Sequence, residues 1–140
     1  MKVEPKRLRA FLLDSNLVSK KDFNKALKKA EKTGKDVDDV LVAEGLISEG
    51  KLAELKAYIL GIPFVDLAKR DIPSETLKII PEPIARRHNI IAFNKDGKKM
   101  EVAMLDPEDL RTIEFIKKKA GLKILPRLTT EESIKSALKQ

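Results

Sequence analysis

Apolar residues recur at helical spacing through residues 5–60 of the chain. Side chains three and four positions apart fall into four groups, and this period predicts four amphipathic helices. The groups are Leu8, Phe11 and Leu12; Phe23, Ala26, Leu27 and Ala30; Val37, Val40 and Leu41; and Leu52, Leu55 and Ile59. Ser19 and Ser48 are suitable N-caps, and Gly34 and Gly45 are suitable C-terminal stops, so the helix boundaries can be predicted as well.

The helical region contains an internal repeat with an offset of 29 residues. The matching pairs are Leu12 and Leu41, Leu13 and Val42, Asn16 and Gly45, Leu17 and Leu46, Val18 and Ile47, Ser19 and Ser48, and Phe23 and Leu52. Each copy ends a helix, turns at a residue that tolerates positive φ, buries two apolar residues and caps the next helix with serine. We interpret the repeat first as a structural one, in which two helix-turn-helix units with the same internal packing stack on each other.

The pattern changes at Gly61, where strand-like runs begin to alternate with helical ones. Residues 90–94 and 99–105 are rich in β-formers and are joined by Lys95, Asp96 and Gly97, which predicts a hairpin.

A helix, a third strand and a terminal helix are predicted after the hairpin. Asp106 as N-cap and Pro107 at the first helical position predict a helix to about Ala120, ended by Gly121. Residues 123–128 are typical of a strand, and residues 129–140 of a capped helix. The order strand, helix, strand indicates a crossover and a small mixed sheet. We therefore expect an α+β protein with a four-helix repeat region at residues 1–61 and a mixed-sheet domain at residues 62–140.

The net charge of +7 in 140 residues suggests a nucleic acid or a membrane surface as the partner. Acidic residues interrupt most of the basic clusters, and the few aromatic residues sit mostly in apolar patterns. A solvated lysine surface is the simpler interpretation, and a basic nucleic-acid-binding module remains an alternative.

The residues that most enzymes and metal sites need are scarce in this sequence. There is no cysteine, the single histidine is His88, and no G-x-x-x-x-G-K-[ST] motif is present. We therefore expect no ATP hydrolysis, no metal site and no cofactor. No long apolar run or signal peptide occurs, which favours a cytoplasmic protein.

An ordered set of residues resembles a known family over essentially the whole chain. The set comprises Gly61, Pro63 and Asp66, then Leu77 and Pro81, then Ala85 and Arg86, then the hairpin, then Ala103, Asp106 and Pro107. It resembles the N-terminal domain of the assembly ATPases of type II secretion and type IV pili. The resemblance implies a non-catalytic regulatory and docking domain that connects the motor domain of the same ATPase to the cytoplasmic domain of an inner-membrane platform protein. Its location would be cytoplasmic and peripheral to the inner membrane through these partners, without membrane insertion.

Some members of that family bind cyclic di-GMP through a duplicated motif that opens with Arg-Leu-Gly, has a middle Gly and closes with Gln. The first copy here keeps Arg7 and Leu8, but it has Arg9 for the early Gly, Asn16 for the middle Gly and Ala30 in place of Gln. Glycine lets a backbone approach a ligand and glutamine can hydrogen-bond a guanine edge, so these losses weaken the ligand hypothesis.

The second copy departs further from the motif. Residues 36–38 read Asp-Val-Asp at its opening, Gly45 is kept, and Ile59 stands at the closing position. A cyclic di-GMP sensor is therefore an alternative function, with Arg7, Leu8, Asn16 and Gly45 as weak candidate site residues.

The first predicted helix combines a basic edge with apolar residues at a helical spacing. We expect it to dock a partner, and the candidate residues are Lys6, Arg7, Arg9 and Phe11. The alternative is that Leu8, Phe11 and Leu12 only complete the helical core.

Overall fold

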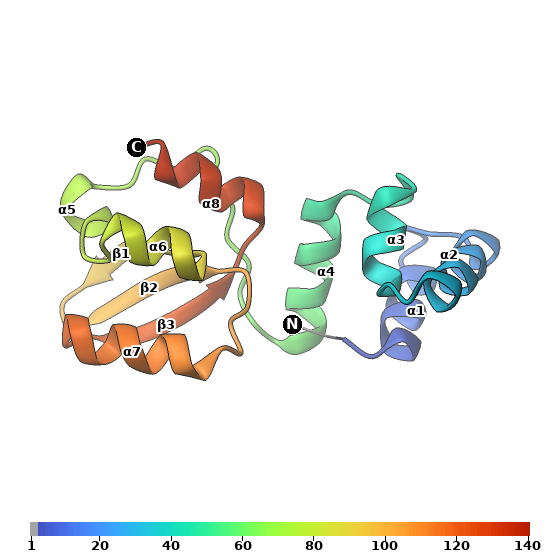
Figure 1. The fold of residues 1–140 in the computed structure, drawn as a ribbon, viewed down its shortest axis with the longest axis horizontal. Helices are drawn as coiled ribbons and strands as arrows, with labels where there is room; N and C mark the ends of the chain where they lie inside the picture. The colour runs from blue at the N-terminus through green and yellow to red at the C-terminus, as the bar shows by residue number, and fades with distance from the viewer. Residues whose placement is uncertain (1–2) are drawn as a thin grey trace. The chain divides into compact units, whose positions relative to one another are not determined.

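A computed structural model describes residues 3–140, in which contacts divide the chain into two compact units. The helical unit runs to Leu60, and the sheet unit comprises Gly61–Gln140 (Figure 1). Eight helices and one three-stranded mixed sheet lie within the described residues, so the predicted α+β class is confirmed.

The helical unit consists of α1 (Pro5–Asp14), α2 (Lys20–Thr33), α3 (Val37–Ala43) and α4 (Glu49–Leu60). These are the four helices that the spacing predicts. Leu8, Leu12, Phe23 and Leu41 are fully buried and form the centre of its core. Corresponding apolar residues of the two repeat copies therefore pack together in one core.

The two turns of the repeat make the same backbone hydrogen bonds. The Leu17 N–H donates to the Leu12 carbonyl over 3.1 Å, and the Leu46 N–H donates to the Leu41 carbonyl over 3.0 Å. This bond from the second residue past the C-cap back to the last turn of the helix is the Schellman arrangement, which satisfies a carbonyl that the helix leaves free.

The two serine caps are equivalent in the same way. The Asp22 N–H donates to Ser19 Oγ over 3.1 Å, and the Lys51 N–H donates to Ser48 Oγ over 3.2 Å. Both predicted N-caps are confirmed, and the repeat is a structural one down to individual hydrogen bonds.

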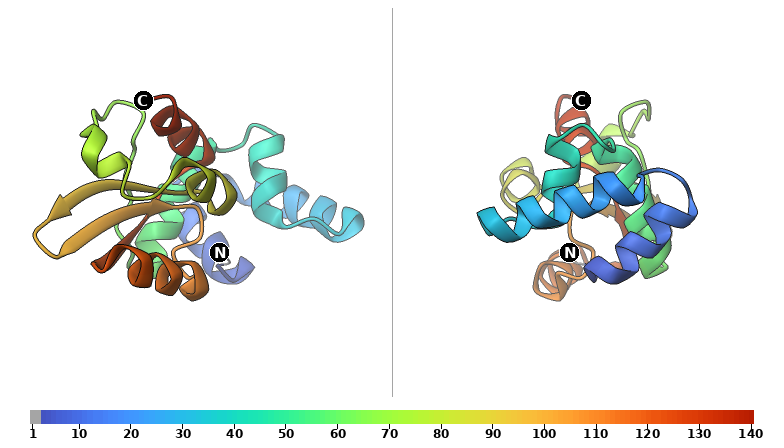
Figure 2. Two further views of the ribbon diagram at one scale, coloured as in Figure 1. Left: turned by 60° about the vertical axis from the view of Figure 1, so that its left-hand side comes forward. Right: turned by 90° about the vertical axis from the view of Figure 1, so that its right-hand side faces the viewer.

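The sheet unit follows the order α5 (Ser74–Leu77), α6 (Glu82–His88), β1 (Ile90–Asp96), β2 (Lys99–Met104), α7 (Leu110–Ala120), β3 (Lys123–Leu128) and α8 (Glu131–Leu138). Strand β2 lies in the middle, antiparallel to β1 and parallel to β3. Helix α7 is the predicted crossover and lies on one face of the sheet, while α6 and α8 lie on the other (Figures 1 and 2).

The hairpin connection is shorter than predicted. Strand β1 continues through Asp96, which pairs with Lys99, so only Gly97 and Lys98 form the turn. Gly97 has a φ of 60°, as the first central residue of a type II′ turn requires. The Asp-Gly signal located the turn correctly, but the tight turn lets both flanking residues pair.

The prediction that Asp106 caps the crossover helix is wrong. Helix α7 begins at Leu110, and the Asp109 carboxylate accepts from the Thr112 N–H over 3.2 Å and from the Thr112 hydroxyl over 2.7 Å. Asp106 instead accepts from the Glu108 N–H over 3.1 Å and forms a turn ahead of the helix. Asp109 has a hydroxyl partner one turn into the helix, and this second bond favours the later start.

Candidate functional site

The four docking candidates on α1 occupy different environments. Lys6 and Arg7 are exposed, Arg9 is half-buried and Phe11 is partly buried against the helical core. Their neighbours Leu8 and Leu12 are fully buried. The apolar stripe of α1 thus completes the core, as the alternative interpretation held for these two leucines, and leaves a basic edge at the surface.

Arg7 bonds to the far end of the repeat region. Its guanidinium Nη2 donates to the Ile59 carbonyl over 3.2 Å, across 52 positions of sequence. A cation beside the last carbonyls of α4 is favoured by the helix dipole. Arg7 therefore helps to hold α1 against α4, in addition to carrying charge at the surface.

Phe11 meets an aromatic residue that sequence reasoning missed. The ring centroids of Phe11 and Tyr58 lie 5.9 Å apart in an edge-to-face arrangement, with an interplanar angle of 72°. Tyr58 is 74% exposed. The spacing of Leu55 and Ile59 placed Tyr58 at the margin of the apolar stripe of α4, which was the available signal.

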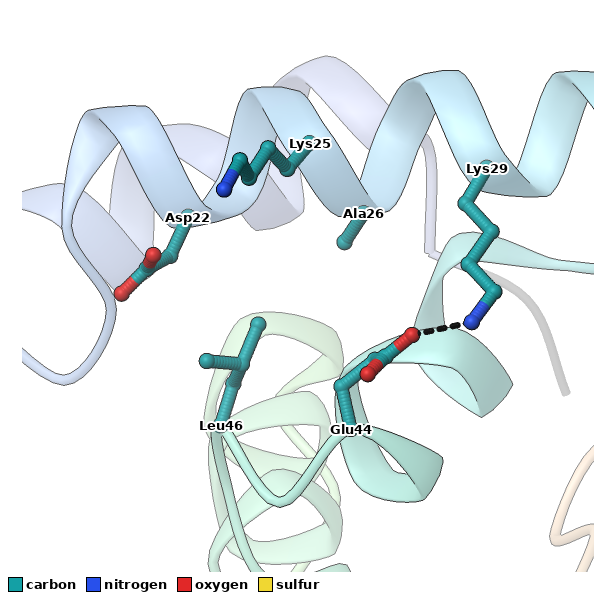
Figure 3. Close-up of a pocket in the computed structure, with 6 residues that line it drawn as sticks. All are labelled: Asp22, Lys25, Ala26, Lys29, Glu44 and Leu46. Carbon is teal, nitrogen blue, oxygen red and sulfur yellow. Dashed lines mark hydrogen bonds and ion pairs between the residues drawn. The ribbon is translucent and has the colours of Figure 1, made fainter.

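A pocket of about 440 Å³ lies between α2 and the turn that joins α3 to α4. We call it the α2 pocket, and its lining residues are Asp22, Lys25, Ala26, Lys29, Glu44 and Leu46. Figure 3 shows Lys29 of α2 reaching to Glu44 across one side of this pocket, where the two form an ion pair. The Lys29 ammonium holds the pKa of the Glu44 carboxyl below its usual value, so the ion pair favours the ionised form of Glu44.

A second pocket, of about 370 Å³, lies between α4 and the turn that joins α1 to α2. We call it the α4 pocket, and its lining residues are Ser15, Leu17, Lys51, Glu54 and Leu55. All five occupy positions whose repeat counterparts line the α2 pocket. The repeat therefore generates two equivalent hollows, each formed by one turn against a helix of the other copy.

The weak cyclic di-GMP candidates are not gathered at one hollow. Leu8 is fully buried in the core, Arg7 bonds to the end of α4, and Asn16 and Gly45 lie in separate turns. The two positions where the motif would close with Gln are also buried, since Ala30 is 5% and Ile59 is 7% exposed. In this chain these two positions serve the core.

The sheet unit holds one polar cluster of partly buried side chains. Asn94 donates to Glu101 over 2.8 Å, and Arg127 Nε donates to the same carboxylate over 3.0 Å. The pKa of Glu101 is lowered, chiefly by the hydrogen bond from Asn94 and further by Arg127, while burial of the carboxylate opposes this shift. The cluster links β1, β2 and β3, and we interpret it as a contribution to the stability of the sheet.

His88, the single histidine, belongs to the sheet unit. It is the last residue of α6, and its Nδ1 lies 3.5 Å from the Thr112 hydroxyl. Within residues 3–140, no cluster of three or more histidine, cysteine or acidic side chains has a metal-binding arrangement. Over the same residues, no helix combines the length and apolar character that crossing a membrane requires.

The chain is similar to one domain family and to several type IV pilus assembly ATPases. Residues 60–140 match the model of the MshEN domain. The type IV pilus assembly ATPase PilB of Myxococcus xanthus is 29% identical over 134 residues, which cover 96% of this chain and 24% of PilB. PilB of Thermus thermophilus is 33% identical over 135 residues, which cover 95% of this chain and 15% of that protein. The chain spans about a quarter or less of these relatives.

Two solved structures share the fold. A structure of MshE with cdg has 25% sequence identity and a TM-score of 0.74, over 94% of this chain and 96% of that one. The N-terminal domain of XpsE has 20% identity and a TM-score of 0.64, over 99% of this chain and 96% of that one.

These matches confirm the predicted resemblance to the N-terminal domain of assembly ATPases of type IV pili. The match over residues 60–140 covers more than half of the chain, which therefore belongs to the MshEN domain family.

Proposed function

We propose that this domain docks a pilus or secretion assembly ATPase onto the cytoplasmic domain of an inner-membrane platform protein and transmits that contact to the motor. The helical unit makes the contact, and the ATPase is held at the inner membrane through it. Support comes from the relatives, which are assembly ATPases far longer than this chain, and from the absence of a P-loop motif in its sequence.

The observation that carries this proposal is the basic edge of α1. Lys6, Arg7 and Arg9 lie within two turns, and none of them forms an ion pair with an acid of residues 3–140. Leu8 and Leu12 of α1 are buried in the core of the helical unit, and the only hydrogen bond from these three basic side chains within residues 3–140 is that of Arg7 to α4. Unpaired surface charge of one sign steers a partner of the opposite sign and fixes its orientation.

Cyclic di-GMP sensing is the second candidate, because the MshE structure with cdg has the same fold over nearly the whole chain. The repeat keeps its paired turns and hollows here. Against this function, the closing positions of both motif copies are buried apolar residues, and Arg7 already has a structural partner. A nucleic-acid module is the third candidate and is disfavoured, because the basic residues are dispersed between acids.

One titration series separates the three functions. The purified chain is titrated with the cytoplasmic domain of the platform protein from the same source, with cyclic di-GMP, and with a single-stranded oligonucleotide. We expect the platform domain to bind with a Kd of about micromolar, and the other two to bind at least about a hundredfold more weakly. If cyclic di-GMP binds tightly and the platform domain does not bind, the docking function is wrong and ligand sensing is the better assignment.

A further inference from the structure

The seam between α1 and α4 brings together side chains that form a continuous surface. Arg7 bonds to the Ile59 carbonyl at one end, and Phe11 packs against Tyr58 one turn further along α1. Beyond this aromatic pair, the seam leads into the α4 pocket, because Ser15 lies one turn after Phe11. We call the surface formed by Phe11, Tyr58 and the α4 pocket the α1–α4 groove.

Comparison of the two repeat copies shows which residues of the groove are required for packing and which are not. Tyr58 stands where the other copy has Lys29, and Ser15 stands where it has Glu44. In the α2 pocket, Lys29 and Glu44 form an ion pair across the hollow. The same fold thus accommodates lysine at the position of Tyr58, so packing alone does not explain an aromatic residue there.

Tyr58 has the properties of an interface anchor. It is 74% exposed, yet the edge-to-face contact with Phe11 restrains its ring. Leu17 and Leu55 extend the apolar surface from this ring into the α4 pocket, and both are only partly buried. Exposed, pre-oriented tyrosines beside a pocket dominate many protein interfaces, because they gain much apolar contact for little lost side-chain entropy.

The charges of the groove define the occupant. At one end stands Arg7, which shares a face of α1 with Phe11 and has no acidic partner within residues 3–140. At the other end, Lys51 and Glu54 form an ion pair of 3.6 Å and neutralise each other. A complementary segment is therefore apolar along one face and acidic at one end.

We propose that the α1–α4 groove binds an amphipathic helix of the docking partner, with its apolar face on Tyr58 and Leu55 and its acidic end beside Arg7. A helix suits a surface between two antiparallel helices, because residues at i, i+3, i+4 and i+7 present one apolar stripe to it. This inference rests on the proposed docking function and adds where the partner binds and what chemistry the partner brings.

The repeat supplies a matched pair of variants for the test. Tyr58→Lys installs the residue that the other copy carries at the equivalent position, so the fold should tolerate it. Lys29→Ala removes that counterpart from the α2 pocket and serves as the control. We expect Tyr58→Lys to weaken binding of the platform domain by at least about tenfold, with an unchanged melting temperature, and Lys29→Ala to leave affinity unchanged.

A second probe makes the test independent of the platform protein. It is a synthetic helical peptide of about four turns, with leucines at i, i+3, i+4 and i+7 and glutamates in its first turn. A matched peptide carries lysines in place of the glutamates. We expect the acidic peptide to bind and to shift the NMR signals of Phe11 and Tyr58, and the basic peptide to bind at least about tenfold more weakly.

The outcomes distinguish failure of the groove from failure of the docking function. If the platform domain binds wild type and Tyr58→Lys equally well, the groove is overturned while docking stands. If only the acidic peptide binds, and Tyr58→Lys abolishes that binding, the groove stands while the platform partner is wrong. Binding of neither probe overturns both, and a wild-type dimer that Tyr58→Lys converts to a monomer reassigns the surface to contact between copies.

Discussion

Asn16 and Gly45 hold positive φ angles of 58° and 72° at equivalent points of the two repeat turns. Each residue follows the end of a helix and lets the chain reverse into the Schellman hydrogen bond. Left-handed backbone is strained for most residues but accessible to Gly and, to a lesser degree, to Asn. The duplicated segment is thus defined by its turns as much as by its apolar residues.

Replacing Gly45 tests whether backbone strain governs this turn. A Cβ at Gly45 would meet no atom within 4 Å, so a substitution there changes backbone energy alone. We expect Gly45→Ala to lower the free energy of unfolding by about 1 kcal/mol, and Gly45→Asn to lower it by less, because Asn stands at the equivalent turn. Urea unfolding measures both.

Gly50 is the control for that experiment. It lies in α4 with ordinary helical backbone, and its Cβ position is also open. Gly50→Ala should raise stability by about 0.5 kcal/mol. An equal loss of stability for both alanine variants would contradict an effect of positive φ.

The two units should unfold separately, because each has its own apolar core. Leu41→Ala empties a fully buried site of the helical unit and should cost about 3 kcal/mol there. Native-state hydrogen exchange should show lost protection in residues 3–60 and unchanged protection in β1 and β2. A single opening free energy throughout the chain would count against two units divided near Gly61.

The Glu101 cluster predicts acid sensitivity of the sheet unit. The pKa of Glu101 is lower in the folded protein than its ordinary value of 4.5, chiefly through the Asn94 hydrogen bond. The carboxylate therefore contributes stability that is present above about pH 4.5 and is lost as the pH falls through the folded-state pKa. Glu101→Gln should destabilise the protein at neutral pH and have a smaller effect at about pH 3.

Glu114 is the control, since it is exposed on α7 and has no ion pair among the interactions of residues 3–140. Chemical denaturation of both variants at the two pH values gives the comparison. The same stability loss for Glu101→Gln at both pH values would show that its charge is not the cause.

Cyclic di-GMP should bind no more tightly than about millimolar, because the side chains that could bond a guanine are replaced by buried Ala30 and Ile59. Calorimetry with MshE as the positive control measures this. A micromolar constant for this chain would mean that the turns and hollows suffice without the motif residues.

Sequence periodicity predicted the helical unit well, because each helix keeps an apolar stripe and has a recognisable cap. Local ambiguity caused the error at α7, where Asp106 and Asp109 are both credible caps and only the Thr112 hydroxyl bond favours the second. The length of the hairpin turn was missed because pairing of Asp96 with Lys99 depends on the partner strand.

The candidate site was less accessible to sequence reasoning. The basic edge of α1 is visible in the sequence, but the bond from Arg7 to Ile59 and the contact of Phe11 with Tyr58 join residues far apart along the chain. The repeat does align the residues of the two pockets. The pockets themselves form only because each turn packs against a helix of the other copy, and this packing is not visible in the sequence.

The most direct test of docking through α1 reverses its charge without disturbing its packing. Arg7 is left in place because it bonds to the end of α4, and the double variant Lys6→Glu with Arg9→Glu is compared with wild type. At low salt, we expect affinity for the platform domain to fall by at least about tenfold, while the melting temperature changes little, because Lys6 is exposed, Arg9 is only half-buried and neither forms an ion pair within residues 3–140. Equal affinity of the double variant and the wild type at low salt would contradict docking through this helix.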